Sequence, residues 1–258
     1  MESIDIDMNG LKYQDKQRFT KEPHCHEMLI EEKWQEVPGC SSISGMFDEG
    51  LWRCAWASKM AVDYIVENMT PAKAFYDEPQ FWKDAKNAWR TKRDTARDSG
   101  TILHESMETY IKQKIEGVDI GVPLLIPTEF EKKVEDFIAW EKENKVQWLA
   151  SELQVGHLEH QYCGILDCLY LSGGNVYLDD IKTSKAFKRE WIMQLVGLAK
   201  ALKFMGHRVD KIGIIHMPKD GGKFQRIPVE VDIDREFEGF LVAKDFYKAR
   251  NLFNARNK

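Results

Sequence analysis

The chain has no run of eighteen apolar residues, and its acidic start, residues 1–7, contains no apolar signal region. A helix that crosses a membrane needs about 20 predominantly apolar residues, and a secretory signal needs a basic start followed by an apolar stretch. We therefore expect a soluble, intracellular protein of the cytoplasm that has no membrane partner.

Paired cysteines are also lacking. The number of cysteines is odd, and no two have the spacing of a zinc ribbon; the five are Cys25, Cys40, Cys54, Cys163 and Cys168. A disulfide framework uses an even number of cysteines in a small secreted chain. The cysteine content therefore argues against both a disulfide framework and a zinc ribbon.

An excess of basic residues is missing as well, because 37 Lys and Arg residues face 42 Asp and Glu residues and the net charge is -5. Nucleic-acid-binding proteins normally have a basic surface. Basic residues nevertheless gather in two stretches, residues 83–97 and 182–189, although the first could equally be a solvated helix face. Carboxylates that hold a metal ion add to the formal charge without repelling a polyanion once the ion is bound, so a nucleic-acid substrate is not excluded.

The 258 residues, 43% of them hydrophobic, suffice for one substantial core with or without an accessory subdomain. We expect little regular structure in residues 1–36, apart from a strand or hairpin near their end, and a helical region over residues 42–97. Further elements are expected in the order helix 129–145, strands 148–155, 162–171 and 175–182, a helix, strands near 211–217 and 225–231, and a closing helix from about 235. This order predicts an α/β fold with a mixed central sheet flanked by helices and a helical N-terminal portion.

Two carboxylates and a lysine lie on neighbouring predicted strands. Asp167 is in the first strand, residues 172–175 form a hairpin turn, and Asp180 and Lys182 are in the second strand. Because side chains alternate between faces, Asp180 and Lys182 share an apolar face, whereas Asp179 points the other way. Each ionisable group on such a face would cost several kcal/mol, of order ~5, if it lost water without gaining a partner. A divalent cation held by Asp167 and Asp180 would compensate them.

Hard cations with oxygen ligands suit phosphodiester cleavage. Attack on phosphorus adds negative charge to oxygens that are already anionic, and a cation stabilises this charge while activating water. Lys182 could place its ammonium group beside the attacking water or the developing charge. An ordinary salt bridge at a strand end is the alternative, because isolated Asp-x-Lys triplets are common.

Gln194 belongs to a predicted helix whose apolar stripe consists of Trp191, Leu195, Leu198 and Leu202. Its amide falls within this stripe, and a buried amide needs hydrogen-bond partners. Lys182 or a substrate phosphate could supply them. The alternative is a glutamine at the edge of the stripe that reaches solvent.

Together these residues resemble the motifs of the PD-(D/E)XK nuclease superfamily, in particular its RecB-like branch. That branch has glycine, an apolar residue, any residue and Asp, then a short hairpin, Asp-x-Lys-Thr, and a helix bearing Gln. The matching residues are Gly164, Asp167, Asp180, Lys182, Thr183 and Gln194. The family often has Tyr four residues after the Gln, where this chain has Leu198. The resemblance implies a restriction-endonuclease-like core, with Asp167, Asp180, Lys182 and Gln194 as catalytic residues and the Ile181 carbonyl as a metal ligand.

The resemblance continues upstream of these motifs. Residues 100–105 resemble the branch's histidine motif, which makes His104 a metal ligand, and Glu152 stands where related exonucleases place a further catalytic carboxylate. A core histidine and an exposed strand glutamate are the alternatives. The implied cofactor is Mg²⁺ or Mn²⁺, and mixed nitrogen and oxygen ligands suit Mn²⁺ somewhat better. Some relatives bind an iron-sulfur cluster through three cysteines after the lysine motif; because no cysteine follows Cys168, we expect no such cluster.

Residues 38–66 look like part of the phage-encoded exonucleases and of the mitochondrial genome maintenance group, so the chain could be virus-encoded. We expect a nuclease core over residues 100–258 and a mostly helical portion, residues 1–99, that packs on or arches over it. The implied function is a metal-dependent DNA exonuclease that prefers single-stranded ends, with DNA contacts from Thr183, Lys185, Arg90 and Arg93. A structure-selective endonuclease, an RNase, and a non-catalytic nucleic-acid-binding protein with a decayed site remain alternatives, and the oligomeric state is open.

Overall fold

The computed structural model describes residues 11–21, 25–47, 51–70, 79–118, 125–219 and 221–256. At its centre is a five-stranded sheet in which the strands lie in chain order. These strands are β4 (Gln147–His157), β5 (Tyr162–Ser172), β6 (Asn175–Lys182), β7 (Lys211–His216) and β8 (Gln225–Val229). β6 and β7 run parallel, whereas the other neighbours run antiparallel. The expected α/β class with a mixed central sheet is therefore confirmed.

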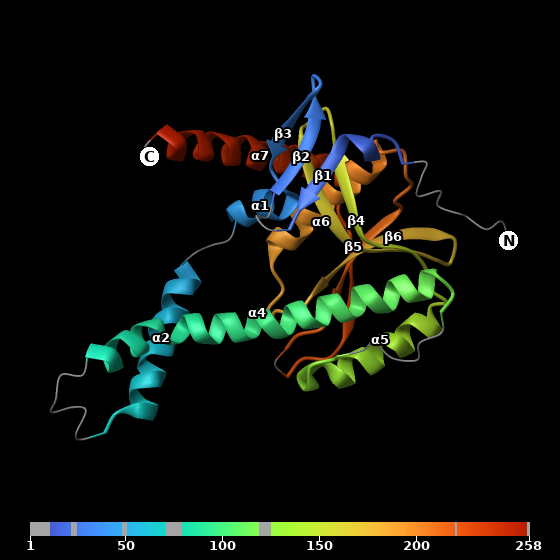
Figure 1. The fold of residues 1–258 in the computed structure, drawn as a ribbon. Helices are drawn as coiled ribbons and strands as arrows, with labels where there is room; N and C mark the ends of the chain where they lie inside the picture. The colour runs from blue at the N-terminus through green and yellow to red at the C-terminus, as the bar shows by residue number, and fades with distance from the viewer. Residues whose placement is uncertain are drawn as a thin grey trace.

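Helices cover both faces of this sheet (Figure 1). On one face lie α1 (Cys40–Ser44), α6 (Arg189–Phe204) and α7 (Ile233–Arg256), and on the other lie α4 (Pro79–Ile115) and α5 (Glu131–Glu143). Each face has its own apolar core, because successive strand residues point to opposite faces. Leu178 of β6 packs in the first core with Leu195 and Leu198, whereas Ile181 packs in the second with Met107 and Phe137.

A second sheet includes a hairpin near residue 36, as expected, and extends further towards the N-terminus than the sequence indicated. It is antiparallel and consists of β1 (Gln17–Thr20), β2 (Cys25–Ile30) and β3 (Lys33–Val37). Met28 and Val37 pack against Cys163 of the central sheet. The first four residues of β3 are exposed, so the sequence there lacks the apolar alternation by which a strand is recognised.

His104 lies in the second half of a long helix. It belongs to α4, which runs unbroken from Pro79 to Ile115, so the expected division between residues 99 and 100 falls inside one helix. Gly100 lies inside this helix. Its role is close packing, because a β-carbon there would lie 3.1 Å from the Thr183 hydroxyl oxygen.

The helical region expected over residues 42–97 contains α2 (Leu51–Asn68), a short turn at Gly45–Phe47 and the first half of α4. Figure 1 shows α2 beside the N-terminal half of α4, away from the central sheet. Tyr64 of α2 contacts Phe81 of α4, with ring centroids 5.8 Å apart. In the described residues α2 thus pairs with α4.

Candidate active site

The central sheet opens between β5 and β6, and the two predicted catalytic aspartates lie at the opening. The pairing of β5 with β6 ends at Cys168 and Asp179. Beyond this point β5 continues along β4, and β6 continues along β7 as far as the pair of Lys182 with His216. The next residues in register, Asp167 and Asp180, therefore flank the gap. The Ile181 amide donates a hydrogen bond of 2.7 Å to Asp167 Oδ2 and fixes this carboxylate at the gap. We call this point, where β5 and β6 separate beyond Cys168 and Asp179, the fork.

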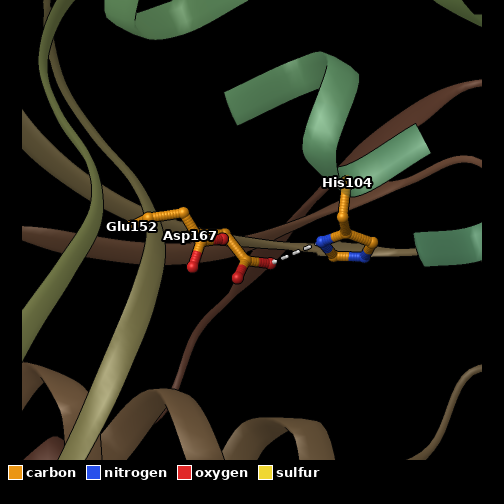
Figure 2. Close-up of side chains that lie close together, drawn as sticks. All are labelled: His104, Glu152 and Asp167. Atoms are coloured by element: carbon orange, nitrogen blue, oxygen red, sulfur yellow. Dashed lines mark ion pairs between the residues drawn. The ribbon is translucent and has the colours of Figure 1, made fainter. Parts of the chain in front are cut away.

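His104, Glu152 and Asp167 bring their ligand atoms together at this fork (Figure 2). One donor atom of each residue lies within 4.8 Å of the others, and His104 Nδ1 is 3.7 Å from Asp167 Oδ2. Glu152 falls opposite Asp167, between the ladder pairs formed by Ser151 and Leu153. Two like charges directly opposite in a sheet are destabilising, whereas an imidazole and two carboxylates suit a divalent cation.

The metal-free protein accommodates Glu152 at a cost. Its φ of 51° lies in the left-handed region, which is rare for a non-glycine residue and uncommon within a strand. Burial, followed by the negative charges of Asp167 and Glu108, raises the pKa of Glu152 to about 8. A bound cation would reverse this effect by favouring the ionised carboxylate. The arrangement thus fits a metal ion better than it fits three unliganded side chains.

Asp180, Lys182 and Gln194 form a second group, in which Asp180 interacts with Asp167. The Lys182 ammonium contacts Asp180 Oδ2 and donates to Gln194 Oε1 at 3.2 Å, and Gln194 Nε2 donates to Asp180 Oδ1 at 3.4 Å. Burial and the adjacent Asp167 charge raise the pKa of Asp180. Burial opposes the charge of Lys182, but the carboxylates of Asp180 and Asp167 raise its pKa overall. The neighbouring carboxylates thus favour the charged form of Lys182.

The structure thus brings the predicted residues together but divides them into two groups. Glu152 joins His104 and Asp167, while Asp180 is almost fully buried and holds Lys182. Asp180 and the Ile181 carbonyl as metal ligands stay predictions. Gln194 has the lysine partner that its place in the apolar stripe suggested.

A cavity of about 390 Å³ opens onto the first group and contains residues that the sequence did not single out as site residues. Its lining comprises Lys21, Gly100, Thr101, His104, Glu105, Glu108, Glu152 and Thr183. Glu108 could have been found from its position one helical turn after His104. Lys21 gave no sequence signal, because it reaches the cavity from the N-terminal sheet, where it lies 3.5 Å from Glu105.

The residues predicted to contact DNA are dispersed. Thr183 lines the cavity, and Lys185 is exposed in the loop that follows it. Arg90 is exposed on the first half of α4, where its guanidinium group lies 5.4 Å from the Trp89 ring centroid. The Arg93 side chain lies outside the described residues. The DNA contacts of all four stay predictions.

Packing explains the motif glycine and the departure at position 198. A β-carbon on Gly164 would lie 2.5 Å from Leu198 Cδ2 and 2.9 Å from Cys40 Sγ. Leu198 is fully buried in the core beneath the site. Position 198 therefore provides packing in this chain and contributes no polar group to the site.

Comparison with known proteins identifies no family for this chain. No family model matches it, and no curated protein matches it. A crystal structure of SSO0001 aligns with a TM-score of 0.35 and 11% identity, covering 77% of this chain and 86% of that one. The alkaline exonuclease LHK-Exo from Laribacter hongkongensis aligns with a TM-score of 0.31 and 15% identity, covering 59% and 84%. Likenesses at this level carry no argument about function, which therefore depends on the geometry of the site.

None of the described helices is both long enough and apolar enough to span a membrane.

Proposed function

We propose that the protein is a divalent-metal-dependent nuclease that hydrolyses phosphodiester bonds at the fork between β5 and β6. One observation carries the proposal: the ligand atoms of His104, Glu152 and Asp167 converge within 4.8 Å, and Lys182 is held next to them by Asp180 and Gln194. The resemblance of its motifs to those of the RecB-like branch of the PD-(D/E)XK superfamily supports this proposal.

In this proposal His104, Glu152 and Asp167 hold Mg²⁺ or Mn²⁺, and Asp180 completes the site from behind Asp167. The ion supplies charge stabilisation at the phosphate and lowers the pKa of water. Lys182 provides a fixed positive charge for the phosphate oxygens in the transition state. Gln194 orients the ammonium group by accepting its hydrogen bond, which leaves the remaining protons for Asp180 and substrate.

The more specific form of the proposal is a DNA exonuclease that prefers single-stranded ends. Thr183 on the cavity wall and the exposed Lys185 beside it would then contact the phosphates of the strand. Each neutralised phosphate of a single strand should contribute about 0.7 to the slope of log affinity against log salt.

The test is cleavage in Mn²⁺ of internally labelled single-stranded DNA of one sequence, which is supplied either as a linear strand or as a covalently closed strand. We expect the linear strand to be degraded and the closed strand to persist. Equal degradation of both would favour an endonuclease, and cleavage restricted to an RNA of this sequence would favour an RNase. If none of the three substrates is cleaved with Mg²⁺ or with Mn²⁺, the proposal is contradicted.

A further inference from the structure

The loop between β6 and α6 exposes an aromatic ring four residues after Thr183, which lines the site cavity. Phe187 is 43% exposed, although burial of a phenylalanine side chain normally stabilises a folded protein. Two basic residues of the same stretch, Lys185 and Arg189, are also exposed. An apolar ring in such surroundings fits a ligand that combines flat apolar groups with negative charge.

The ring has a rigid support. Phe187 contacts Trp191 edge to face, with ring centroids 5.4 Å apart and an interplanar angle of 67°. Trp191 is only 6% exposed and belongs to the core beneath α6. Because the supporting ring cannot move freely, Phe187 would lose little conformational freedom when a ligand covers it.

Hydrogen bonds fix the loop that presents the ring. His216 Nε2 lies 2.7 Å from the Ser184 carbonyl oxygen, and the Ser184 hydroxyl donates to the Ala186 carbonyl at 3.2 Å. The His216 ring also contacts Trp191, with centroids 5.8 Å apart. His216 therefore contacts both the start of the loop and the helix that follows it.

The same elements hold the catalytic lysine. His216 is the register partner of Lys182 in the parallel pair of β6 with β7. Gln194, which accepts the Lys182 hydrogen bond, lies one helical turn after Trp191 on α6. Phe187 and Lys182 thus belong to one strand, loop and helix unit, with the exposed ring at the loop and the ammonium group in the site.

We propose that Phe187 is a base-stacking residue that binds an unpaired base of a single-stranded nucleic acid, next to the nucleotide at the active site. This inference rests on the proposed function and adds a specificity determinant to it. The bases of an unpaired strand offer open faces, whereas a duplex covers these faces by its own stacking. Lys185 and Arg189 supply charge for the flanking phosphates, which also favours a nucleic acid over an apolar protein partner.

The test measures binding of a fluorescein-labelled oligothymidylate by anisotropy in EDTA, where cleavage does not interfere. Phe187→Ala should bind about tenfold more weakly than the wild type, within the range measured for single stacked bases. Phe187→Trp keeps a stacking surface and should bind at least as tightly as the wild type. Phe246→Ala removes a phenylalanine on α7 that is even more exposed, at 62%, and should leave binding unchanged.

A second measurement separates stacking from a change in loop structure. An abasic nucleotide is moved along the oligonucleotide, which keeps every phosphate but removes one base at a time. One position should weaken wild-type binding about tenfold, and the same substitution should have no effect on Phe187→Ala. The inference is overturned if Phe187→Ala binds as tightly as the wild type, or if its deficit persists on a fully abasic strand.

This outcome is independent of the outcome for catalysis. If the wild type cleaves DNA but Phe187→Ala binds normally, the stacking role is wrong and the nuclease proposal stands. If the wild type cleaves nothing but the abasic effect depends on Phe187, the stacking role stands and the nuclease proposal fails.

Discussion

Removal of the Glu152 charge should stabilise the metal-free protein, and the gain should depend on pH. The pKa of Glu152 rises from 4.5 to about 8 on folding. Between these values the folded protein binds more protons than the unfolded chain, so its stability falls as pH rises through this window. Each pH unit within this window lowers the free energy of unfolding by at most about 1.36 kcal/mol. The loss caused by Glu152 at pH 8 is therefore at most about 5 kcal/mol. Because the side chain is partly exposed, solvent screening should reduce the effect to roughly 2 kcal/mol.

Glu152→Gln keeps the shape of the side chain and its strained backbone but removes the titration. The free energy of unfolding is measured with urea in EDTA at pH 5, 6, 7 and 8 for both proteins. The free energy of unfolding of the variant, relative to that of the wild type, should increase steadily with rising pH. Mn²⁺ should then stabilise the wild type and have little effect on the variant. A constant difference across the pH range would refute the reasoning, as would a wild type that gains on the variant.

Three other changes test separate parts of the structure. Lys182→Ala should retain Mn²⁺ binding in calorimetry but lose at least ~100-fold in cleavage rate, the scale of one fixed charge stabiliser; a rate equal to the wild type would reduce the residue to a structural salt bridge. Burial and the nearby charges of His160, Lys200 and Lys244 lower the pKa of His157 to about 3, so the protein should lose stability as pH falls from about 6.5 towards 3. His157→Phe should remove this loss, and parallel pH profiles for the two proteins would contradict the assignment. Gly164→Ala should cost about 1–3 kcal/mol of unfolding free energy by overpacking against Leu198, and Leu198→Ala in the same chain should recover part of this cost; an unchanged urea midpoint in the single variant would show that the core yields without strain.

The parts of the fold with strong local patterns were predictable from the sequence. The β5–β6 hairpin combines two alternating strands with Gly173 and Gly174, whose φ values of 54° and 80° suit a tight hairpin turn. The stripe on α6 places Gln194 towards the site, where it meets Lys182. In such elements the local period and the tertiary environment agree.

The remainder depends on contacts between distant segments. The exposed residues of β3 have no apolar alternation, so the sequence indicated a strand or hairpin near residue 36 but not the whole N-terminal sheet. Gly100 packs against the Thr183 hydroxyl group, which lies in another part of the chain. Lys21 reaches the cavity only because the N-terminal sheet packs on the core. No local pattern records such long-range contacts.

The most direct test of the proposed nuclease site is single-turnover cleavage of labelled single-stranded DNA in Mn²⁺ by the wild type, Asp167→Asn and Asp63→Asn. Asp167 lies at the fork beside His104, whereas Asp63 is an α2 carboxylate outside the site cavity that pairs with Lys59. We predict that Asp167→Asn loses at least ~100-fold in rate and that Asp63→Asn cleaves like the wild type. Cleavage by Asp167→Asn at the wild-type rate would contradict the account, because the observed activity would then not arise at the fork between β5 and β6.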